Sequence, residues 1–352
     1  MKFELFITRL KVFALVDHFL SFGLSTKDNI MVYGFWRSGT TFIMEQVAAI
    51  TSSRSYFEPL LLKIPGNWPV KYARRHSPEL HKFIIPDELN RHPYLYIGTN
   101  QSESGIDTFI NQMMVGKVSS KWTRKSRPLK YAFKKNISLK LVRANLMAAY
   151  LSKRYSCKSV FVLRHPCGII ASMTRKHKKR KNKGSIETGL NSAAFIDSIL
   201  NQESLVRDYL SPFLNAINKW KTNEFNRIIL VWAITNYVPL KQIKDGKFKP
   251  FFILYEALVS DSKCYSQLAE YLNNQPIGQG VGNYLDRDSA TVQGERGSVP
   301  PMKRLFSWRD ELSPTQVQTV YEICASFGSV IMDQIEAIDH FADEMPSEAM
   351  TK

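Results

Sequence analysis

Five short apolar runs alternate with stretches of helical periodicity, and this alternation constrains the fold more than any other feature of the chain. The expected strands are residues 29–35, 54–57, 138–142, 159–163 and 250–255. Helical patterns are found at about 40–50, 144–155, 168–174 and 227–243. Alternating strands and helices favour a parallel sheet, because parallel neighbours are joined by a crossover that a helix usually supplies. We therefore expect an α/β fold of three layers, with a central parallel sheet and helices on both faces.

All 352 residues are assigned to one domain with two additions. In residues 1–26, an apolar stripe predicts an amphipathic helix docked on the body; the stripe consists of Phe6, Leu10, Phe13 and Leu20. Charged residues interrupt this segment, so it fits neither an export signal nor a membrane span, while attachment to a membrane surface stays open. Residues 60–135, rich in proline, aromatic and charged residues, are predicted to be an irregular insertion over the carboxyl edge of the sheet, where substrates of such folds bind.

The four cysteines are far apart in the sequence and form no CxxC pair or Cys/His cluster. They are Cys157, Cys167, Cys264 and Cys324. This spacing indicates ordinary buried thiols in a reducing compartment, and it predicts neither a disulfide framework nor a zinc site.

The net charge of +17 is concentrated in one part of the chain. Residues Lys117 to Lys183 hold 21 Lys and Arg and no Asp or Glu, whereas elsewhere 31 acidic residues outnumber 27 basic ones. A field of this kind attracts polyanions or a highly charged small ligand. A solvated basic face is the alternative explanation, but a run so long without one carboxylate favours an anionic partner.

A glycine-punctuated turn between the first expected strand and helix has the pattern of a phosphate-binding loop. Its residues are Gly34, Arg37, Ser38, Gly39, Thr40 and Thr41. Glycines permit the tight turn, the helix N-terminus favours an anion, and the threonine hydroxyls can donate to it. The P-loop lysine is replaced by Thr40, the cation comes three residues earlier, and the neighbouring strand ends offer no aspartate for Mg²⁺. The fold is thus P-loop-like, but ATP hydrolysis fits it poorly.

This loop and further motifs resemble the sulfotransferases that use 3′-phosphoadenosine 5′-phosphosulfate (PAPS), above all the carbohydrate sulfotransferases. The string "RSGTT" matches their 5′-phosphosulfate loop, and "LRHPCGIIAS" places Arg164 and Ser172 at the spacing of their second motif, with His165 where Asp or Asn is usual. The string "YFEPLL" supplies Glu58 of a third motif. "YEALV" (255–259) echoes a fourth, with alanine for aspartate, and residues 308–324 resemble the closing helix of the family. The resemblance covers roughly residues 29–60, 138–175 and 228–330.

The resemblance implies a role for each matched residue. PAPS carries several anionic groups, so its site needs separate cationic clamps: Arg164 and Ser172 for the 3′-phosphate, and Arg37 for the bridging oxygen between phosphate and sulfuryl group. The remaining loop residues would hold the 5′-phosphosulfate, and no metal is required. A late loop would cover the nucleotide with Arg296 and Gly297.

Glu58 is the preferred general base for the attacking hydroxyl, because the strand before it should end beside the same pocket. Glu45 also lies near the loop, but it is about two turns into the helix. The histidines that remain open as alternative bases are His76, His81, His92 and His165.

We expect the chain to transfer the sulfuryl group of PAPS to an acceptor hydroxyl on a carbohydrate, that is, on a glycan. The aromatic side chains of the insertion suit stacking on sugars, although they could equally form part of the core; they are Trp68, Tyr72, Tyr94, Tyr96 and Trp122. The basic stretch suits an acidic acceptor. The alternatives are a P-loop kinase of a small metabolite and a basic polyanion- or nucleic-acid-binding protein built around residues 117–183. A nucleic-acid partner is less favoured, since it leaves the loop and Glu58 without a purpose. No stretch is a membrane anchor, so the expected location is cytoplasmic, with a peripheral membrane contact as the open alternative.

Overall fold

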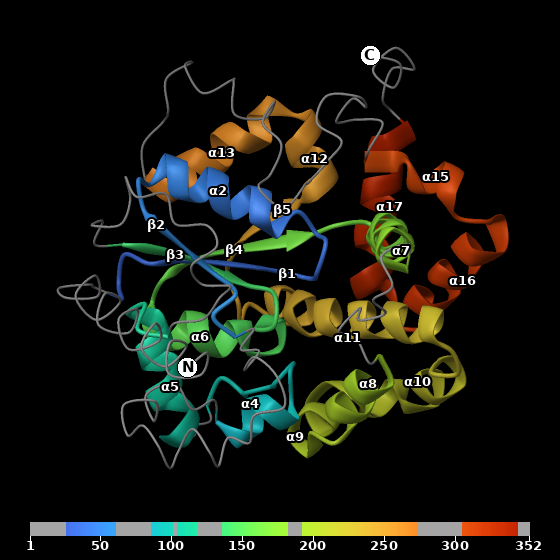
Figure 1. Cartoon of the computed structure of the whole chain (residues 1–352), viewed down its shortest axis with the longest axis horizontal. Coiled ribbons are helices and arrows are strands. Elements are labelled where there is room, and N and C mark those ends of the chain that lie inside the picture. The colour runs from blue at the N-terminus through green and yellow to red at the C-terminus, as the bar shows by residue number, and fades with distance from the viewer. Residues whose placement is uncertain are drawn as a thin grey trace, which may run out of the picture.

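A five-stranded parallel sheet forms the centre of the protein, as the alternating pattern predicts (Figure 1). The computed structural model describes residues 26–60, 86–100, 104–118, 136–181, 192–273 and 305–343. The sheet order is β2-β3-β1-β4-β5. The strands are β1 (Ile30–Gly34), β2 (Arg54–Phe57), β3 (Ile137–Leu141), β4 (Lys158–Leu163) and β5 (Phe251–Leu254). Because β1 lies in the middle, the loop that follows it is flanked by the ends of β3 and β4.

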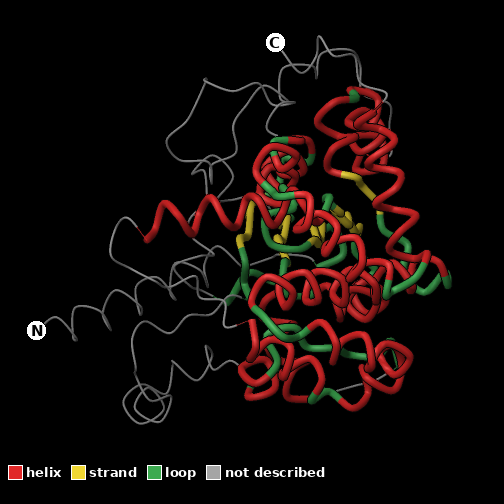
Figure 2. Tube along the Cα trace, turned by 90° about the vertical axis from the view of Figure 1, so that its right-hand side faces the viewer, coloured by secondary structure: helices red, strands yellow, loops and turns green. Residues whose placement is uncertain are grey.

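Helices cover both faces of the sheet, which confirms the predicted three layers. Helices α2 (Thr40–Ile50), α12 (Tyr255–Ser260) and α13 (Ser262–Asn273) lie on one side, and α6 (Ala148–Tyr155) and α11 (Glu224–Lys244) on the other (Figure 1). Figure 2 shows the strands between these helical layers. Successive side chains of a strand point to opposite faces, so Val32 packs in one apolar cluster with α2 and α13, and Tyr33 in the other with α11.

The remaining helices pack around this sandwich, several of them against α11, which is buried along most of its length. Among them, α8, α16 and α17 contact α11, and α7 follows directly from β4. These elements are α4 (Asp87–Arg91), α5 (Ser104–Met114), η3 (Asn145–Met147), α7 (Pro166–Lys181), α8 (Ser192–Leu200), α9 (Glu203–Leu205), η4 (Val206–Leu210), η5 (Ser211–Phe213), α10 (Leu214–Trp220), α15 (Trp308–Glu311), α16 (Pro314–Ala325) and α17 (Ser329–Asp343).

The predicted insertion at 60–135 is neither wholly irregular nor confined to the carboxyl edge of the sheet. Its described part contains α4 and α5, and the carbonyl of Met114, at the end of α5, accepts a hydrogen bond from Asn29 Nδ2 at 2.7 Å. Asn29 directly precedes β1, so α5 ends at the amino edge. In the described part of the insertion, the segment with Tyr94 reaches the opposite edge, where the centre of its ring lies 5.3 Å from that of Trp36. The apolar face of α5 is buried in the core, which explains why this segment is helical.

The segment 308–324, which resembles a single closing helix, is two helices in the structure. Helix α15 ends before Leu312, and α16 begins after Ser313, whose side chain and that of Gln316 form a capping box. Pro314 takes the first position of α16. Proline disfavours helical geometry in the residue before it but is well suited to the first helical turn, so the chain breaks here.

Three of the four free cysteines are buried, as expected, and Cys264 is half-buried. Within the described ranges, no helix combines the length and the apolar character needed to cross a bilayer. The amphipathic helix predicted for residues 1–26 falls, apart from Thr26, outside the described residues.

Candidate active site

Every strand of the sheet is followed at its carboxyl end by a charged side chain within three residues. Across the edge, in sheet order, these residues are Glu58, Arg143, Arg37, Arg164 and Glu256. Adjacent strands lie about 4.8 Å apart, so the five residues are spread along a single edge of the sheet. Substrates of open α/β folds bind at this edge, and it is the one at which the sequence predicts the site.

The turn between β1 and α2 adopts a geometry that depends on glycine at position 39. Gly39 has a φ of 78° and directly precedes the first turn of α2. A Cβ on Gly39 would lie 2.0 Å from a ring carbon of Tyr255, so the site leaves no room for a side chain there. Arg37 also has a positive φ, 67°, a conformation that non-glycine residues seldom adopt and that is frequent at binding loops.

The N-terminus of α2 offers donors that the described chain does not use. No side chain caps this end, and the first amides of a helix have no partner within the helix itself. Ser38 is fully buried, and its Oγ has no hydrogen-bond partner among the described residues. Thr40 and Thr41 are buried in the first turn. Unused donors at a helix N-terminus are suited to hold an anion, and the loop pattern predicts such a ligand here.

The structure brings Arg37, Ser172 and Arg164 together, although they are distant in the sequence. Arg37 Nε donates to Ser172 Oγ at 2.9 Å across 135 sequence positions. Arg164 donates through Nη1 to the carbonyl oxygen of Arg37, also at 2.9 Å. Arg164 directly follows β4, and Ser172 is in the second turn of α7. The loop after β1 and the β4–α7 connection therefore form one site, with two guanidinium groups beside each other.

The positive charge of this site is only partly neutralised. Burial lowers the pKa of Arg37, and the nearby charges of Arg164 and Arg175 lower it further. Glu256, the buried carboxyl nearest to Arg164, lies 3.9 Å from its Nε, beyond hydrogen-bond range. Burial raises the pKa of Glu256 in spite of the opposing effects of Arg164 and His165, which weakens this carboxyl as a counter-charge. An anion bound here would relieve the repulsion between the arginines.

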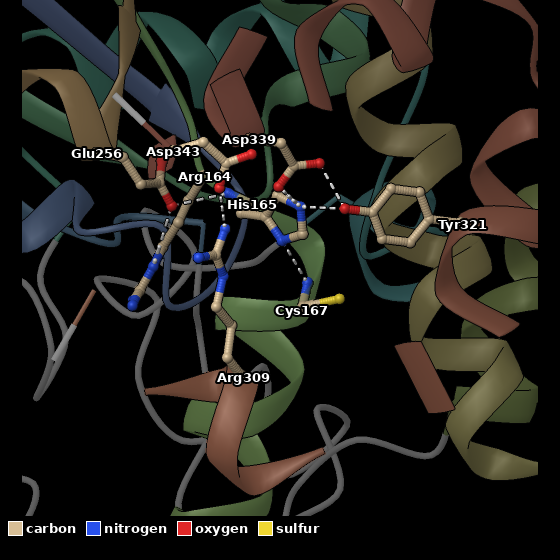
Figure 3. Close-up of polar contacts among 8 residues, drawn as sticks. All are labelled: Arg164, His165, Cys167, Glu256, Arg309, Tyr321, Asp339 and Asp343. Carbon is tan, nitrogen blue, oxygen red and sulfur yellow. Dashed lines mark hydrogen bonds and ion pairs between the residues drawn. The ribbon is translucent and has the colours of Figure 1, made fainter. Parts of the chain in front are cut away.

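His165 holds the backbone of the site against the C-terminal helices (Figure 3). Its amide donates to Glu256 at 3.0 Å, and its Nδ1 accepts from the amide of Cys167 at 3.2 Å. Its Nε2 lies 3.4 Å from Asp339 Oδ1, and its ring stacks at 4.7 Å on Trp308. The imidazole is fully buried with both nitrogens engaged, so it is placed to position Arg164 rather than to accept a proton from a substrate.

Glu58 lies at the same edge, next to the end of β2, and half of its carboxylate is engaged. Its Oε1 is 2.7 Å from Lys140 Nζ, and both side chains are buried. Its Oε2 has no hydrogen-bond partner among the described residues. The residue has a φ of 48°, which holds it in a left-handed turn directly after the strand. A carboxylate oriented by a lysine and open at one oxygen can accept a proton from a bound hydroxyl.

The other candidate bases and cofactor contacts are less well placed or outside the described residues. His92 Nδ1 lies 2.8 Å from the carbonyl oxygen of Ser198, which engages it structurally. Glu45 is half-buried in the second turn of α2. The remaining predicted residues fall outside the described ranges; they are His76, His81, Arg296 and Gly297.

Four residues of this edge have no assigned role in the sequence-based prediction of the site, although two of them, Tyr255 and Glu256, belong to the string "YEALV" noted there. Lys140 and Arg143 lie at the end of β3, and Tyr255 and Glu256 begin α12 after β5. The guanidinium carbon of Arg164 is 5.1 Å from the centre of the Tyr255 ring, so that ring lies between Gly39 and Arg164. All four residues lie within two residues of a predicted strand end. A search for ionisable residues near every predicted strand end would therefore find them.

Two further observations describe the surroundings of the site. A cavity of about 260 Å³ opens between α7 and α15, one turn beyond Ser172, and it is lined by Ala171, Thr174, Arg175, Asp310, Glu311 and Leu312. In the described part of the chain, no three His, Cys, Asp or Glu residues are grouped in a way that could hold a metal ion.

Comparison with known proteins leaves the family open. No protein-family model matches the chain, and no curated protein matches its sequence. Among solved structures, the chain is similar to a sulfotransferase domain from the curacin biosynthetic pathway, with 16% sequence identity and a TM-score of 0.37, over 90% of this chain and 98% of that one. A likeness of this strength assigns no activity, so the function has to be argued from the site.

Proposed function

We propose that the protein is a sulfotransferase that moves the sulfuryl group of PAPS to an acceptor hydroxyl on a carbohydrate. The observation that carries this proposal is the contact of Arg37 with Ser172 and Arg164, which joins an anion-binding loop to a second cationic group. PAPS has anionic groups at both ends of its nucleotide, and a site for it needs two such clamps. The resemblance of the "RSGTT" and "LRHPCGIIAS" strings to PAPS-binding motifs supports the same assignment.

The residues at the edge fit such a donor. Ser38 Oγ is buried without a partner, and Gly39 allows the backbone to approach a bound group. With Thr40 and Thr41, these residues would hold the 5′-phosphosulfate at the N-terminus of α2. Arg164 and Ser172 would hold the 3′-phosphate, since a guanidinium fork and a hydroxyl both donate to its oxygens.

Transfer requires charge stabilisation on one side of the sulfur and proton removal on the other. The donor supplies the sulfuryl group and a phosphate leaving group. Arg37 would stabilise the negative charge that develops on the oxygen between phosphate and sulfur. Glu58, two strands away from β1 and thus about 10 Å along the edge, would accept the proton of the attacking hydroxyl through Oε2, while Lys140 orients the carboxylate. General-base catalysis contributes about 10²–10⁴-fold to a rate.

Calorimetric titration with adenosine 3′,5′-bisphosphate in the absence of Mg²⁺ tests the donor site. We expect binding, and we expect adenosine 5′-monophosphate to bind about 10- to 100-fold more weakly, because charge-assisted hydrogen bonds to the 3′-phosphate contribute about 1.5–3 kcal/mol. Arg164→Ala should reduce bisphosphate affinity by a similar factor. Arg207→Ala is the matched control, since Arg207 is exposed on η4 and forms its ion pair with the neighbouring Asp208.

The same titration separates this proposal from its alternatives. Binding of ATP that needs Mg²⁺, without binding of the bisphosphate, would identify a kinase instead. Binding of an oligonucleotide alone, with steep salt dependence, would identify a nucleic-acid-binding protein. Unchanged bisphosphate affinity in Arg164→Ala would reject the 3′-phosphate role, and transfer of labelled sulfate by Arg37→Ala at the unmodified rate would reject the role of Arg37.

A further inference from the structure

The β2–β3 half of the edge holds a second set of polar groups that the donor does not use. We call Trp36, Glu58, Tyr94, Lys140 and Arg143 the β3 cluster. Glu58 directly follows β2, Lys140 is the last residue but one of β3, and Arg143 comes two residues after β3. Since β1 separates β3 from β4, Arg143 lies about 10 Å along the edge from the Arg164 side.

Charge in the β3 cluster is unbalanced. Glu58 forms its ion pair with Lys140, whose Nζ also lies 4.1 Å from the centre of the Phe57 ring. Arg143 makes no ion pair within the described chain, and its buried Nε has no hydrogen-bond partner there. Burial lowers the pKa of Arg143, and the nearby Tyr94 and Glu58 oppose this effect only in part. One carboxylate thus faces two cations: Glu58 is ion-paired with Lys140 and only partly offsets the charge of Arg143, which has no ion pair of its own in the described chain.

Tyr94 adds a second unused donor beside the same aromatic ring. Tyr94 is fully buried, and its hydroxyl has no hydrogen-bond partner among the described residues. Its ring centre is 5.3 Å from that of Trp36, and the guanidinium carbon of Arg143 is 5.9 Å from the Trp36 ring. Trp36 immediately precedes Arg37 in the loop, so these donors adjoin the position where the sulfuryl group would react.

A guanidinium donates hydrogen bonds and accepts none, and a buried hydroxyl without a partner can donate one. Leaving such groups unpaired in a buried place costs free energy, which a bound oxyanion would recover. A neutral sugar would supply hydroxyls but no counter-charge for Arg143. The ligand that matches both groups is therefore a carboxylate or a sulfate ester.

We propose that Arg143 and Tyr94 form a second anion subsite that binds an acidic group of the acceptor, so that the preferred acceptor is an acidic carbohydrate. This proposal rests on the proposed function for its reference to an acceptor, whereas the subsite itself is a binding site that can be measured alone. Trp36 forms the wall between the subsite and Arg37. The distance of the subsite from the Arg164 side leaves room for donor and acceptor together.

The test is a titration of the full chain, saturated with adenosine 3′,5′-bisphosphate, with three probes followed by ligand-observed NMR. The probes are methyl β-glucoside, methyl β-glucuronide and methyl β-glucoside 6-sulfate. We expect one or both acidic probes to bind at least tenfold more tightly than the neutral one, and the stronger of the two tells carboxylate from sulfate. Arg143→Gln should abolish the preference, Arg143→Lys should retain part of it, and Tyr94→Phe should weaken it severalfold.

Controls separate a local effect from misfolding and from failure of the proposed function. Arg207→Gln should leave all three affinities unchanged, and the Arg143, Tyr94 and Arg207 variants should melt as the unmodified chain does. Glu58→Gln should lose transfer activity but bind the acidic probes no more weakly, because it removes a negative charge. Equal affinity for the three probes, no binding of any of them, or a preference that survives in Arg143→Gln overturns the proposal.

The titration is repeated without the bisphosphate. If the bisphosphate itself fails to bind, the proposed function is wrong, and the preference for acidic probes still decides the subsite. If an acidic probe binds only when the bisphosphate is absent, the two compete for the donor site, and the separate subsite is rejected.

Discussion

Replacing Glu58 by glutamine tests the structure and the mechanism together, because the residue has a structural partner as well as a proposed catalytic role. Lys140 Nζ lies 2.7 Å from Glu58 Oε1, and the two side chains are only 8% and 6% exposed. Breaking a buried pair by removing one partner typically costs about 3–5 kcal/mol, because the other charge stays buried without compensation. Glutamine keeps an oxygen that can face Lys140, so we expect the lower end of that range, about 3 kcal/mol.

The double variant Glu58→Gln/Lys140→Met separates stability from catalysis. It removes both charges, and replacing a buried ion pair by uncharged side chains is often close to neutral. We therefore expect its free energy of unfolding to lie within about 1 kcal/mol of that of the unmodified protein. Denaturant unfolding of the four proteins in the cycle should yield an interaction energy of about 5 kcal/mol between the two positions, because each single variant should lose about 3 kcal/mol and the double variant only about 1 kcal/mol.

Turnover with labelled PAPS completes the test. Both variants that carry Glu58→Gln should lose transfer by a factor of about 10² or more, since the general base is absent from each. Recovered activity in the stable double variant would show that Glu58 is not the base. An unfolding free energy of Glu58→Gln equal to that of the unmodified protein would show that the pair does not have the buried geometry described above.

Two further predictions concern the loop and the His165 contact. Gly39→Ala should lose about 2–4 kcal/mol of stability in denaturant unfolding, because the residue has a positive φ and its Cβ would overlap the Tyr255 ring. Gly246→Ala is the control: its φ is similar but its surroundings are open, so it should lose only about 1 kcal/mol. Equal losses in the two variants would contradict the close approach of Tyr255 to Gly39. Burial alone would raise the pKa of Asp339, but hydrogen bonds from His165 and Tyr321 and the charge of Arg309 lower it. The folded state then binds fewer protons than the unfolded state in the pH range just below the ordinary pKa of Asp339, so stability falls as the pH falls through this range. Asp339→Asn should lack this part of the acid dependence in urea unfolding between pH 5 and pH 3, whereas equal slopes would refute it.

The local elements of the fold could be predicted because their signals lie within a few neighbouring residues. Strand β2 and helix α2 have the bounds predicted for them, and the other strands begin and end within a residue or so of the predicted positions. A buried parallel strand is a continuous apolar run, and a helix start is marked by its turn chemistry. The break at Ser313–Pro314 has such a local signal too, so the prediction of a single helix over 308–324 was wrong although the sequence held the information.

Contacts between distant segments could not be predicted in the same way. The prediction placed residues 60–135 over the carboxyl edge. In the structure, the last residue of α5 is hydrogen-bonded to Asn29 at the amino edge, because the apolar face of α5 packs into the core there. The pairing of Lys140 with Glu58 and the position of Tyr94 beside Trp36 also join residues whose separation in the sequence carries no signal.

The sequence by itself determined that this chain forms a parallel α/β sheet, that a glycine turn after its first strand precedes a helix, and which arginines and carboxyls stand at strand ends. Only the tertiary structure decided that Arg37 contacts Ser172 and Arg164, and that Arg143 lies on the opposite side of β1 from them. The physical reason is that strand order follows from how both faces of the sheet are packed by helices, and that packing sums contacts over the whole chain. Local propensity specifies where each strand ends, but it does not specify which strand ends become neighbours.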